Sequence, residues 1–211
     1  MGLVVEDGFS HRSRRELVRP ASPPGSPQPY GELMSEINVR ALGEEDWQQF
    51  RAIRLTALQD SPEAFVATAA QEAALDEQAW RERMRRARRL VAERDGSPVG
   101  VVSLGQGDPE HSCTGELFGL WVAPEGRGTG VAWKLVEAGA AQALADGHRN
   151  LGYWVGTDNG RAVAFASSFG FRPTGTRRAM RVTNETDGAE EMVMVLPLGE
   201  DPGAVPSTVV R

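Results

Sequence analysis

A glycine-rich segment in the middle of the chain has the residue types of a phosphate-binding turn. It reads PEGRGTGVA from Pro124 to Ala132 and follows an apolar run that ends at Val122. Small residues let backbone N–H groups converge on one point, and a helix that begins here adds the positive end of its dipole. The segment therefore predicts a site for an anionic group such as a phosphate.

The spacing of its glycines separates this segment from two common nucleotide-binding motifs. A P-loop ends in Gly-Lys-Ser or Gly-Lys-Thr, whereas the segment ends in Gly130–Ala132. A dinucleotide fingerprint needs a third glycine three residues after the second, and those positions hold Val131 and Trp133. Neither motif is complete, so we do not expect a nucleotide site of either kind.

The spacing that is complete is Arg-x-x-Gly-x-Ala, from Arg127 to Ala132, and here the sequence resembles the GNAT superfamily of N-acetyltransferases. The strand exit Leu120–Pro124 precedes it, and an Asn-containing motif at Asn159–Phe165 and a Gly-Phe ending at Phe169–Phe171 follow in the family order. The resemblance covers roughly residues 37 to 198. In that family the loop holds the pyrophosphate of CoA. The structural alternative is a tight strand-to-helix connection without a ligand.

The resemblance implies acetyl-CoA as the acyl donor. No metal is expected, because no metal-ligand spacing joins Cys113 to a histidine. Backbone N–H groups of Leu120 to Val122 would face the thioester carbonyl, because the family separates its fourth and fifth strands there. Trp121 could instead be core, as an aromatic residue on a strand usually is, and Asn159 could also cap a helix. The predicted donor-binding residues are Leu120, Trp121, Val122, Arg127, Gly128, Thr129, Gly130, Val131, Ala132, Trp133 and Asn159.

Acyl transfer to an amine needs a base, because an alkyl ammonium with a pKa of about 10.4 is protonated at neutral pH. Glu116 lies on the strand that leads to Val122, at a position where the family often carries a carboxylate that faces the cleft. We predict that Glu116 removes the proton, directly or through water. The structural alternative is that Glu116 solvates the end of a strand or pairs with an arginine.

Two positions depart from the family pattern. Many members place a tyrosine seven residues after the motif asparagine, as the acid for the leaving thiolate, and this chain has Ala166 there. Possible substitutes are Ser167, Ser168 and Tyr153, although water can also protonate a CoA thiolate. Trp154 occupies a position where some relatives have a glutamate. Beside an N-acetyltransferase that acts on a primary amine of a small molecule, peptide or protein, the sequence therefore leaves open an acyl-CoA-binding sensor or scaffold without turnover.

Arginines are concentrated in two stretches, from Arg81 to Arg89 and from Arg177 to Arg181. The first stretch points in too many directions to form one stripe, which favours a solvated basic face over a site for an anionic substrate. A nucleic-acid partner is not expected, because the chain has a net charge of -6 and a pI near 5.2.

Alternating strand and helix signals predict an α+β fold. The resemblance adds a mixed, mostly antiparallel central sheet flanked by helices, with strands 4 and 5 splayed. Asp95-Gly96 marks a hairpin, because both residue types tolerate positive φ. The three strands at 90–94, 99–104 and 115–122 should form an antiparallel meander. Other strands are expected at 37–41, 150–155, 171–177 and 191–198, and helices from about 46 to 60 and at 75–89, 128–146 and 160–169.

Composition and length predict one domain with extensions. Of 211 residues, 40% are hydrophobic, and a Pro- and Arg-rich leader at 1–35 and a tail at 199–211 frame a domain at 36–198. The single cysteine, Cys113, excludes an internal disulfide and favours a reducing cytoplasm. No apolar run indicates a membrane span. Because family members are often dimers, the resemblance leaves a homodimer open.

Overall fold

The computed structural model describes residues 36–111, 113–180 and 189–199. The described residues belong to one compact unit, Ser35–Arg211. The predicted leader at 1–35 and all of the predicted tail beyond Gly199 lie outside the described residues.

Seven strands form one sheet in the order β1-β2-β3-β4-β5-β7-β6. All neighbours are antiparallel except β4 and β5, which are parallel. This is the mixed, mostly antiparallel sheet that the sequence predicts, and it includes the meander β2-β3-β4. The strands are β1 Ile37–Leu42, β2 Arg88–Arg94, β3 Ser97–Gln106, β4 Gly115–Val122, β5 Asn150–Gly156, β6 Arg172–Ala179 and β7 Glu190–Pro197.

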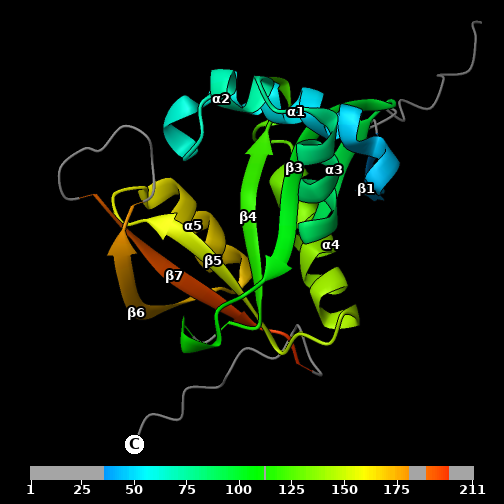
Figure 1. Ribbon diagram of the computed structural model, residues 1–211. Coiled ribbons are helices and arrows are strands. Elements are labelled where there is room, and N and C mark those ends of the chain that lie inside the picture. Colours follow the sequence, from blue (N-terminus) through cyan, green and yellow to red (C-terminus); the bar gives the residue numbers. More distant parts are fainter. Residues whose placement is uncertain (1–35, 112, 181–188, 200–211) are drawn as a thin grey trace, which may run out of the picture. The chain divides into compact units, whose positions relative to one another are not determined.

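The central strands β4 and β5 diverge along their length. Only Gly115–Leu117 pairs with Leu151–Tyr153, and the two strands then open away from each other (Figure 1). The expected splay of the fourth and fifth strands is therefore confirmed. It leaves the backbone of the last half of β4 without a sheet partner on its β5 side.

A bulge bends β4 just beyond the paired segment. Val101 of β3 opposes Trp121, and Ser103 opposes Phe118. In the step between these two pairs β4 therefore contains one residue more than β3. Gly119 lies within that step and adopts φ +62, a conformation that favours glycine. The bulge changes which side chains of β4 face each side of the sheet.

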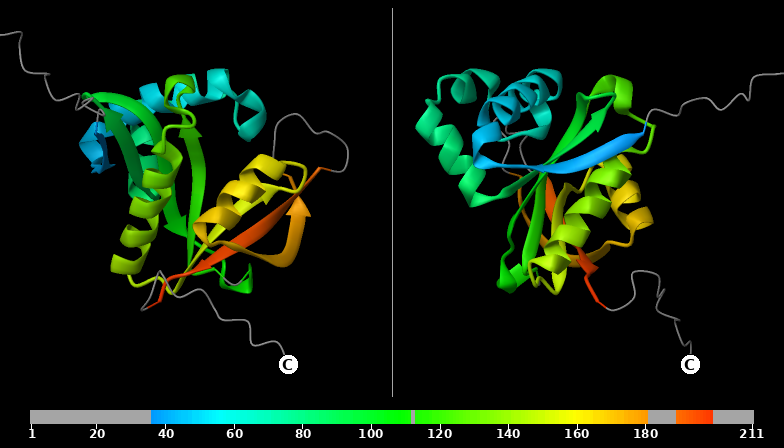
Figure 2. Two further views of the ribbon diagram at one scale, coloured as in Figure 1. Left: turned by 180° about the vertical axis from the view of Figure 1, so that it is seen from behind. Right: turned by 90° about the vertical axis from the view of Figure 1, so that its right-hand side faces the viewer.

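Helices cover both faces of the sheet (Figure 2). On one face, α4 and α5 pack over a core that includes Leu117, Leu135 and Phe171. On the other, α1 and α3 pack over a second core around Trp80 and Trp121. The helices are α1 Trp47–Asp60, α2 Ala69–Ala73, α3 Glu77–Arg86, α4 Val131–Ala145 and α5 Gly160–Phe169.

Local turn chemistry agrees with the sequence where it is strongest. Asp95 and Gly96 have φ values of 51 and 76 and connect β2 to β3 as a two-residue hairpin turn. Helix α4 ends at Ala145, close to its predicted end at Asp146-Gly147. Both features depend on neighbouring residues only, which is why local patterns find them.

The helix predicted at 75–89 is wrong at its end. Helix α3 stops at Arg86, Ala87 is extended, and Arg88 begins β2. Arg88 and Arg89 are good helix formers, but they pair with Leu104 and Ser103 of β3, and tertiary pairing prevails over propensity. The strand predicted at 99–104 is likewise longer than expected, because β3 runs from Ser97 to Gln106. The short helix α2, capped by Thr68, was not predicted.

Candidate active site

A cavity of about 600 Å³ lies where β4 ends and α4 begins. Its wall combines the splayed half of β4, the glycine-rich segment Pro124–Ala132, called the glycine turn below, and the first residues of α4 and α5. Of the predicted donor-binding residues, all except Thr129 line it. The lining residues are Ser61, Ala64, Phe65, Leu120, Trp121, Val122, Gly126, Arg127, Gly128, Gly130, Val131, Ala132, Trp133, Tyr153, Asn159, Arg161, Ala162 and Phe165.

The glycine turn presents backbone donors to this cavity. Gly128 and Gly130 have φ values of 76 and 88, and a Cβ on either would meet no atom within 4 Å. These glycines are therefore required by backbone conformation and not by crowding. The first backbone bond of α4 runs from Lys134 N–H to the carbonyl of Gly130. The N–H groups of Val131 to Trp133 precede it and are the orphan donors of a helix N-terminus, which suit an anion.

The side chain of Thr129 stabilises the turn from outside the cavity. Its hydroxyl donates to the carbonyl of Gly126 at 2.8 Å and accepts from Nη2 of Arg94 at 2.6 Å. These bonds connect the turn to β2. Thr129 is placed to shape the loop, whereas its side chain does not face the space where the other predicted residues meet.

Arg127 folds back on the strand instead of extending from the loop. Its Nε donates to the carbonyl of Val122 at 3.1 Å, and its Nη2 pairs with Asp60 at the end of α1. Asp60 also accepts a 2.9 Å hydrogen bond from Nε1 of Trp121, and this bond is the main cause of the lowered pKa of Asp60. Sequence analysis missed Asp60, since no local spacing connects it to residues more than 60 positions away.

Trp121 and Asn159 each show the structural role that the sequence left open. Trp121 is buried in the core beneath α1 and α3, and it also lines the cavity. The side chain of Asn159 accepts a 3.0 Å hydrogen bond from the N–H of Ala162 and caps α5. Both residues therefore position their elements at the cavity, whatever further contact they make with a ligand.

Glu116 does not line the cavity but lies on the face of β4 that α1 covers. Its neighbour Leu117 points to α4, since a Cβ on Gly139 would lie 2.8 Å from Leu117. Successive strand residues alternate, so Glu116 points to the opposite face. Phe118 shares that face, and there it meets Arg89 of β2. Glu116 is half-buried.

Cys113 lies close to Glu116 on the same side of the sheet and is fully buried. Burial raises the pKa of the Cys113 thiol, and the negative charge of Glu116 raises it further. Its Sγ lies 3.4 Å from the carbonyl of Asp108. A thiol with a raised pKa is a poor nucleophile.

The position that holds the family tyrosine is part of the core. Ala166 is 1% exposed and packs with the α4 and α5 side of the sheet. Of the substitutes considered, only Tyr153 lines the cavity, and burial raises the pKa of its phenol. Ser168 donates to the carbonyl of Phe165 at 2.7 Å. Tyr153 is therefore the best-placed side-chain acid among the three.

Trp154 builds a polar and aromatic wall on the side where Glu116 lies. Gly152 pairs with Glu116, and Trp154 follows two residues later on the same face of β5. The guanidinium of Arg178 stacks on Trp154 at 3.6 Å, and His111 meets it edge-on at 5.3 Å. The position that some relatives fill with a glutamate is thus occupied by a stacked aromatic residue. Glu116 is therefore the carboxylate that β4 and β5 offer as a candidate base.

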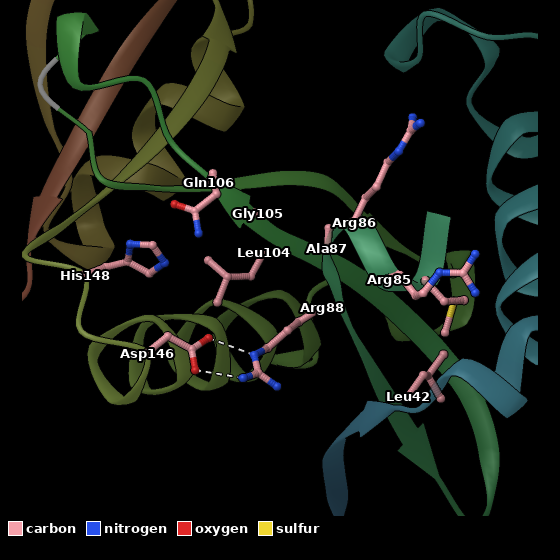
Figure 3. Close-up of a pocket in the computed structure, with 11 residues that line it drawn as sticks. Leu42, Arg85, Arg86, Ala87, Arg88, Leu104, Gly105, Gln106, Asp146 and His148 are labelled. Atoms are coloured by element: carbon pink, nitrogen blue, oxygen red, sulfur yellow. Dashed lines mark hydrogen bonds and ion pairs between the residues drawn. The ribbon is translucent and has the colours of Figure 1, made fainter. Parts of the chain in front are cut away.

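A second cavity, of about 460 Å³, lies at the other end of β2 and β3 (Figure 3). Its arginines come from the stretch that the sequence marks as basic. Arg88 forms two hydrogen bonds with Asp146 at 2.7 and 2.8 Å, Arg85 pairs with Glu44, and Arg86 pairs with Glu82. Because these cations have carboxylate partners, this cavity offers little excess charge to an anion.

Membrane-spanning helices and metal-ligand clusters are both absent from the described residues. Within those residues, no helix has the length and apolar character needed to span a bilayer. The same part of the chain contains no group of three or more His, Cys, Asp or Glu side chains that could hold a metal ion.

Comparison with known proteins identifies the family. The acetyltransferase (GNAT) family model matches residues 45–171, more than half of the chain. The chain belongs to this family. It is also 38% identical over 82 residues to an uncharacterized N-acetyltransferase of Archaeoglobus fulgidus, a match that covers 37% of this chain and 56% of that protein. The chain therefore matches only about half the length of this curated relative.

Solved structures share the fold. An N-acetyltransferase from Staphylococcus aureus has a TM-score of 0.61 and 22% identity, covering 78% of this chain and all of that one. A putative acetyltransferase from Salmonella typhimurium, solved with its cofactor acetyl-CoA, has a TM-score of 0.60 and 21% identity, covering 82% of this chain and 99% of that one. The predicted fold and family are thereby confirmed.

Proposed function

We propose that the protein transfers an acetyl group from acetyl-CoA directly to a primary amine of a small molecule, peptide or protein. The observation that carries this proposal is the cavity between the splayed strand β4, the glycine turn and the start of α4. It provides backbone donors for the pyrophosphate and an open strand edge for the pantetheine. The Salmonella typhimurium neighbour with its cofactor acetyl-CoA supports the same donor.

The proposed chemistry needs a base, donors for the carbonyl oxygen and an acid, and each is supplied by β4 or β5. Glu116, on the α1 face, takes the proton of the incoming ammonium, directly or through water. The neutral nitrogen attacks the thioester carbon while N–H groups of Leu120 to Val122 stabilise the carbonyl oxygen. The carbon–sulfur bond then breaks, and the new amide nitrogen releases its extra proton to water. The thiolate takes a proton either from Tyr153, which water then reprotonates, or from water directly.

An acyl-CoA-binding sensor or scaffold is the second candidate. The burial of Ala166 favours it, because the usual acid of the family has no equivalent at that position. Such a protein would bind acetyl-CoA in the same cavity without turnover. The two candidates therefore differ in catalysis and not in donor binding.

Thiol release from acetyl-CoA, measured with a broad panel of amines, separates these candidates. For an enzyme we expect release that depends on an amine and falls about 100-fold in kcat in Glu116→Gln, with the Kd for acetyl-CoA unchanged. Glu110→Gln, an exposed residue outside the sheet, serves as the control. Tight acetyl-CoA binding without release on any amine would instead support the sensor.

We propose a cytoplasmic location and no nucleic-acid partner, on the single cysteine and the net charge of -6. A homodimer is the assembly that the family resemblance favours. Sedimentation of the full chain distinguishes a monomer from a dimer.

A further inference from the structure

Two arginines bind one buried carboxylate between α1, α2 and α3. Glu72 is 2% exposed. Its carboxylate accepts from Nε and Nη2 of Arg54, each at 3.0 Å, and pairs with Nη1 of Arg83 at 3.0 Å. Burial raises the pKa of Glu72, but the two arginines outweigh it and the pKa is lowered overall. Glu72 is therefore ionised at neutral pH.

Arg89 brings a further cation to this site without a carboxylate of its own. It is 7% exposed, and its guanidinium donates to Ser103 at 2.5 Å and to the carbonyl of Arg83 at 2.9 Å. Phe50 and Phe118 lie against it at 4.6 and 5.5 Å, and its Nε is buried without a partner. Burial, with Arg54 and Arg83 close by, lowers the pKa of Arg89 to about 10.

The arginine cluster, defined as Arg54, Arg83 and Arg89 around Glu72, thus carries an excess of positive charge. Arg54 and Arg83 both pair with the carboxylate of Glu72, and Arg89 interacts electrostatically with that carboxylate and with the two other arginines. A buried cation whose charge is not balanced destabilises the folded state. An anion that binds beside the cluster would offset this cost, and guanidinium groups suit the two oxygens of a carboxylate.

The arginine cluster lies next to the bend of β4. Arg54 uses Nε and Nη2 for Glu72, while its Nη1 lies 4.0 Å from the position of a Cβ on Gly119, within the bulge. The guanidinium of Arg54 also stacks on Phe65 at 4.3 Å. Phe65 lines the cavity at the glycine turn, called the donor cavity below because we propose that it binds acetyl-CoA. Phe118, which contacts Arg89, is 38% exposed. One edge of Arg54 therefore faces the strand segment that separates Glu116 from the donor cavity.

We propose that the amine acceptor carries a carboxylate, which docks on Nη1 of Arg54 beside Gly119 and balances the excess charge of the arginine cluster. This assignment rests on the proposed function and names the substrate class for it. An acceptor held there presents its amine to the face of β4 that carries Glu116. A free amino acid and an acidic peptide share this chemistry.

Paired acceptors test the proposal in the wild-type protein. Each amino acid is compared with its carboxamide, which keeps the amine and removes the charge, and acidic peptides are compared with neutral peptides of equal length. We expect kcat/KM to be about 10- to 100-fold higher for the carboxylate member of at least one of these two pairs. The pair that shows the difference identifies whether the acceptor is a free amino acid or an acidic peptide.

Variants then locate the preference. In Arg54→Gln the ratio between the two members of a pair should fall towards one, while Arg54→Lys keeps the charge and should retain part of the ratio. Arg51→Gln is the matched control, since Arg51 lies on the same helix and donates a 3.1 Å hydrogen bond to the carbonyl of Ala73. If Arg54→Gln does not fold, the ratios measured for Arg54→Lys and for the wild type still show whether Arg54 causes the carboxylate preference.

Three negative outcomes can be told apart. Equal or faster turnover of carboxamides and neutral peptides overturns the carboxylate proposal and leaves the acetyltransferase in place. Tight acetyl-CoA binding without turnover of any amine overturns the proposed function and the acceptor class with it. An unchanged ratio in Arg54→Gln overturns the assignment to Arg54.

Discussion

Oδ2 of Asp60 lies 2.9 Å from Nε1 of Trp121, a hydrogen bond that joins the last residue of α1 to β4. The same carboxylate pairs with Arg127 of the glycine turn. Through these two contacts α1, which borders the face of Glu116, is connected to the loop that we propose binds the donor. The arrangement makes Asp60 a positioning residue for the donor cavity.

Removing this connection should weaken donor binding. In Asp60→Ala both contacts are lost, and Arg127 keeps its hydrogen bond to the carbonyl of Val122 but no longer connects the turn to α1. We therefore expect the Kd for acetyl-CoA to rise about 3- to 10-fold by titration calorimetry. Asp60→Asn keeps the acceptor for Trp121 and should lie between Asp60→Ala and wild type. Glu63→Gln, exposed in the next turn, is the control. Equal Kd values in Asp60→Ala and wild type would contradict the positioning role.

The glycine turn can be tested with two glycines that differ in place but not in strain. Gly130 and Gly147 flank α4 at its two ends, with φ values of 88 and 84 and open space around each. Alanine costs about 1–2 kcal/mol of strain at either position. In Gly130→Ala the turn relaxes to relieve that strain, and acetyl-CoA binding should weaken about 10-fold, whereas Gly147→Ala should lose stability alone. Equal Kd values in the two variants would refute the assignment of the turn to the donor.

Tyr153 is the candidate acid for the leaving thiolate. Tyr153→Phe removes the hydroxyl and keeps the ring, so kcat should fall about 10- to 100-fold with little change in KM for acetyl-CoA. An acid must hold its proton, and the pKa of Tyr153 is raised above its ordinary value of 10. The contribution of Tyr153 should therefore not titrate between about pH 6 and 9. Ser168→Ala is the control, and a wild-type kcat in Tyr153→Phe would leave water as the acid.

Glu72 should stabilise the fold and make it sensitive to acid. Glu72→Gln leaves the arginines of the cluster without their carboxylate, and we expect the free energy of unfolding in urea to fall by about 3 kcal/mol. The folded pKa of Glu72 is lowered from 4.5, so its stabilisation is present above pH 4.5 and is lost as the pH falls through the folded value.

The matched control for this stability effect is Glu82→Gln. Glu82 forms an exposed ion pair with Arg86 one turn away on α3. Such a pair is worth little, so the free energy of unfolding should change by less than about 0.5 kcal/mol. Similar losses in both variants would show that burial at Glu72 has no special weight.

Local sequence signals determined much of the fold and the position of the candidate site. The Asp95-Gly96 turn, the length of α4 and the glycine turn follow from backbone preferences that act between near neighbours. Three motifs in order marked the predicted donor-binding residues, and almost all of these residues line one cavity. Such features need no knowledge of distant contacts.

Tertiary structure alone decided which distant residues meet. The partners of Asp60 are more than 60 positions away, and the arginine cluster joins Arg89 of β2 to Arg54 of α1 and Glu72 of α2. Pairing with β3 turned Arg88 from a predicted helix into a strand. Burial of Ala166 in the core left Tyr153 as the candidate side-chain acid at the cavity. Each of these outcomes depends on contacts between residues remote in the sequence, which periodicity and turn propensity do not encode.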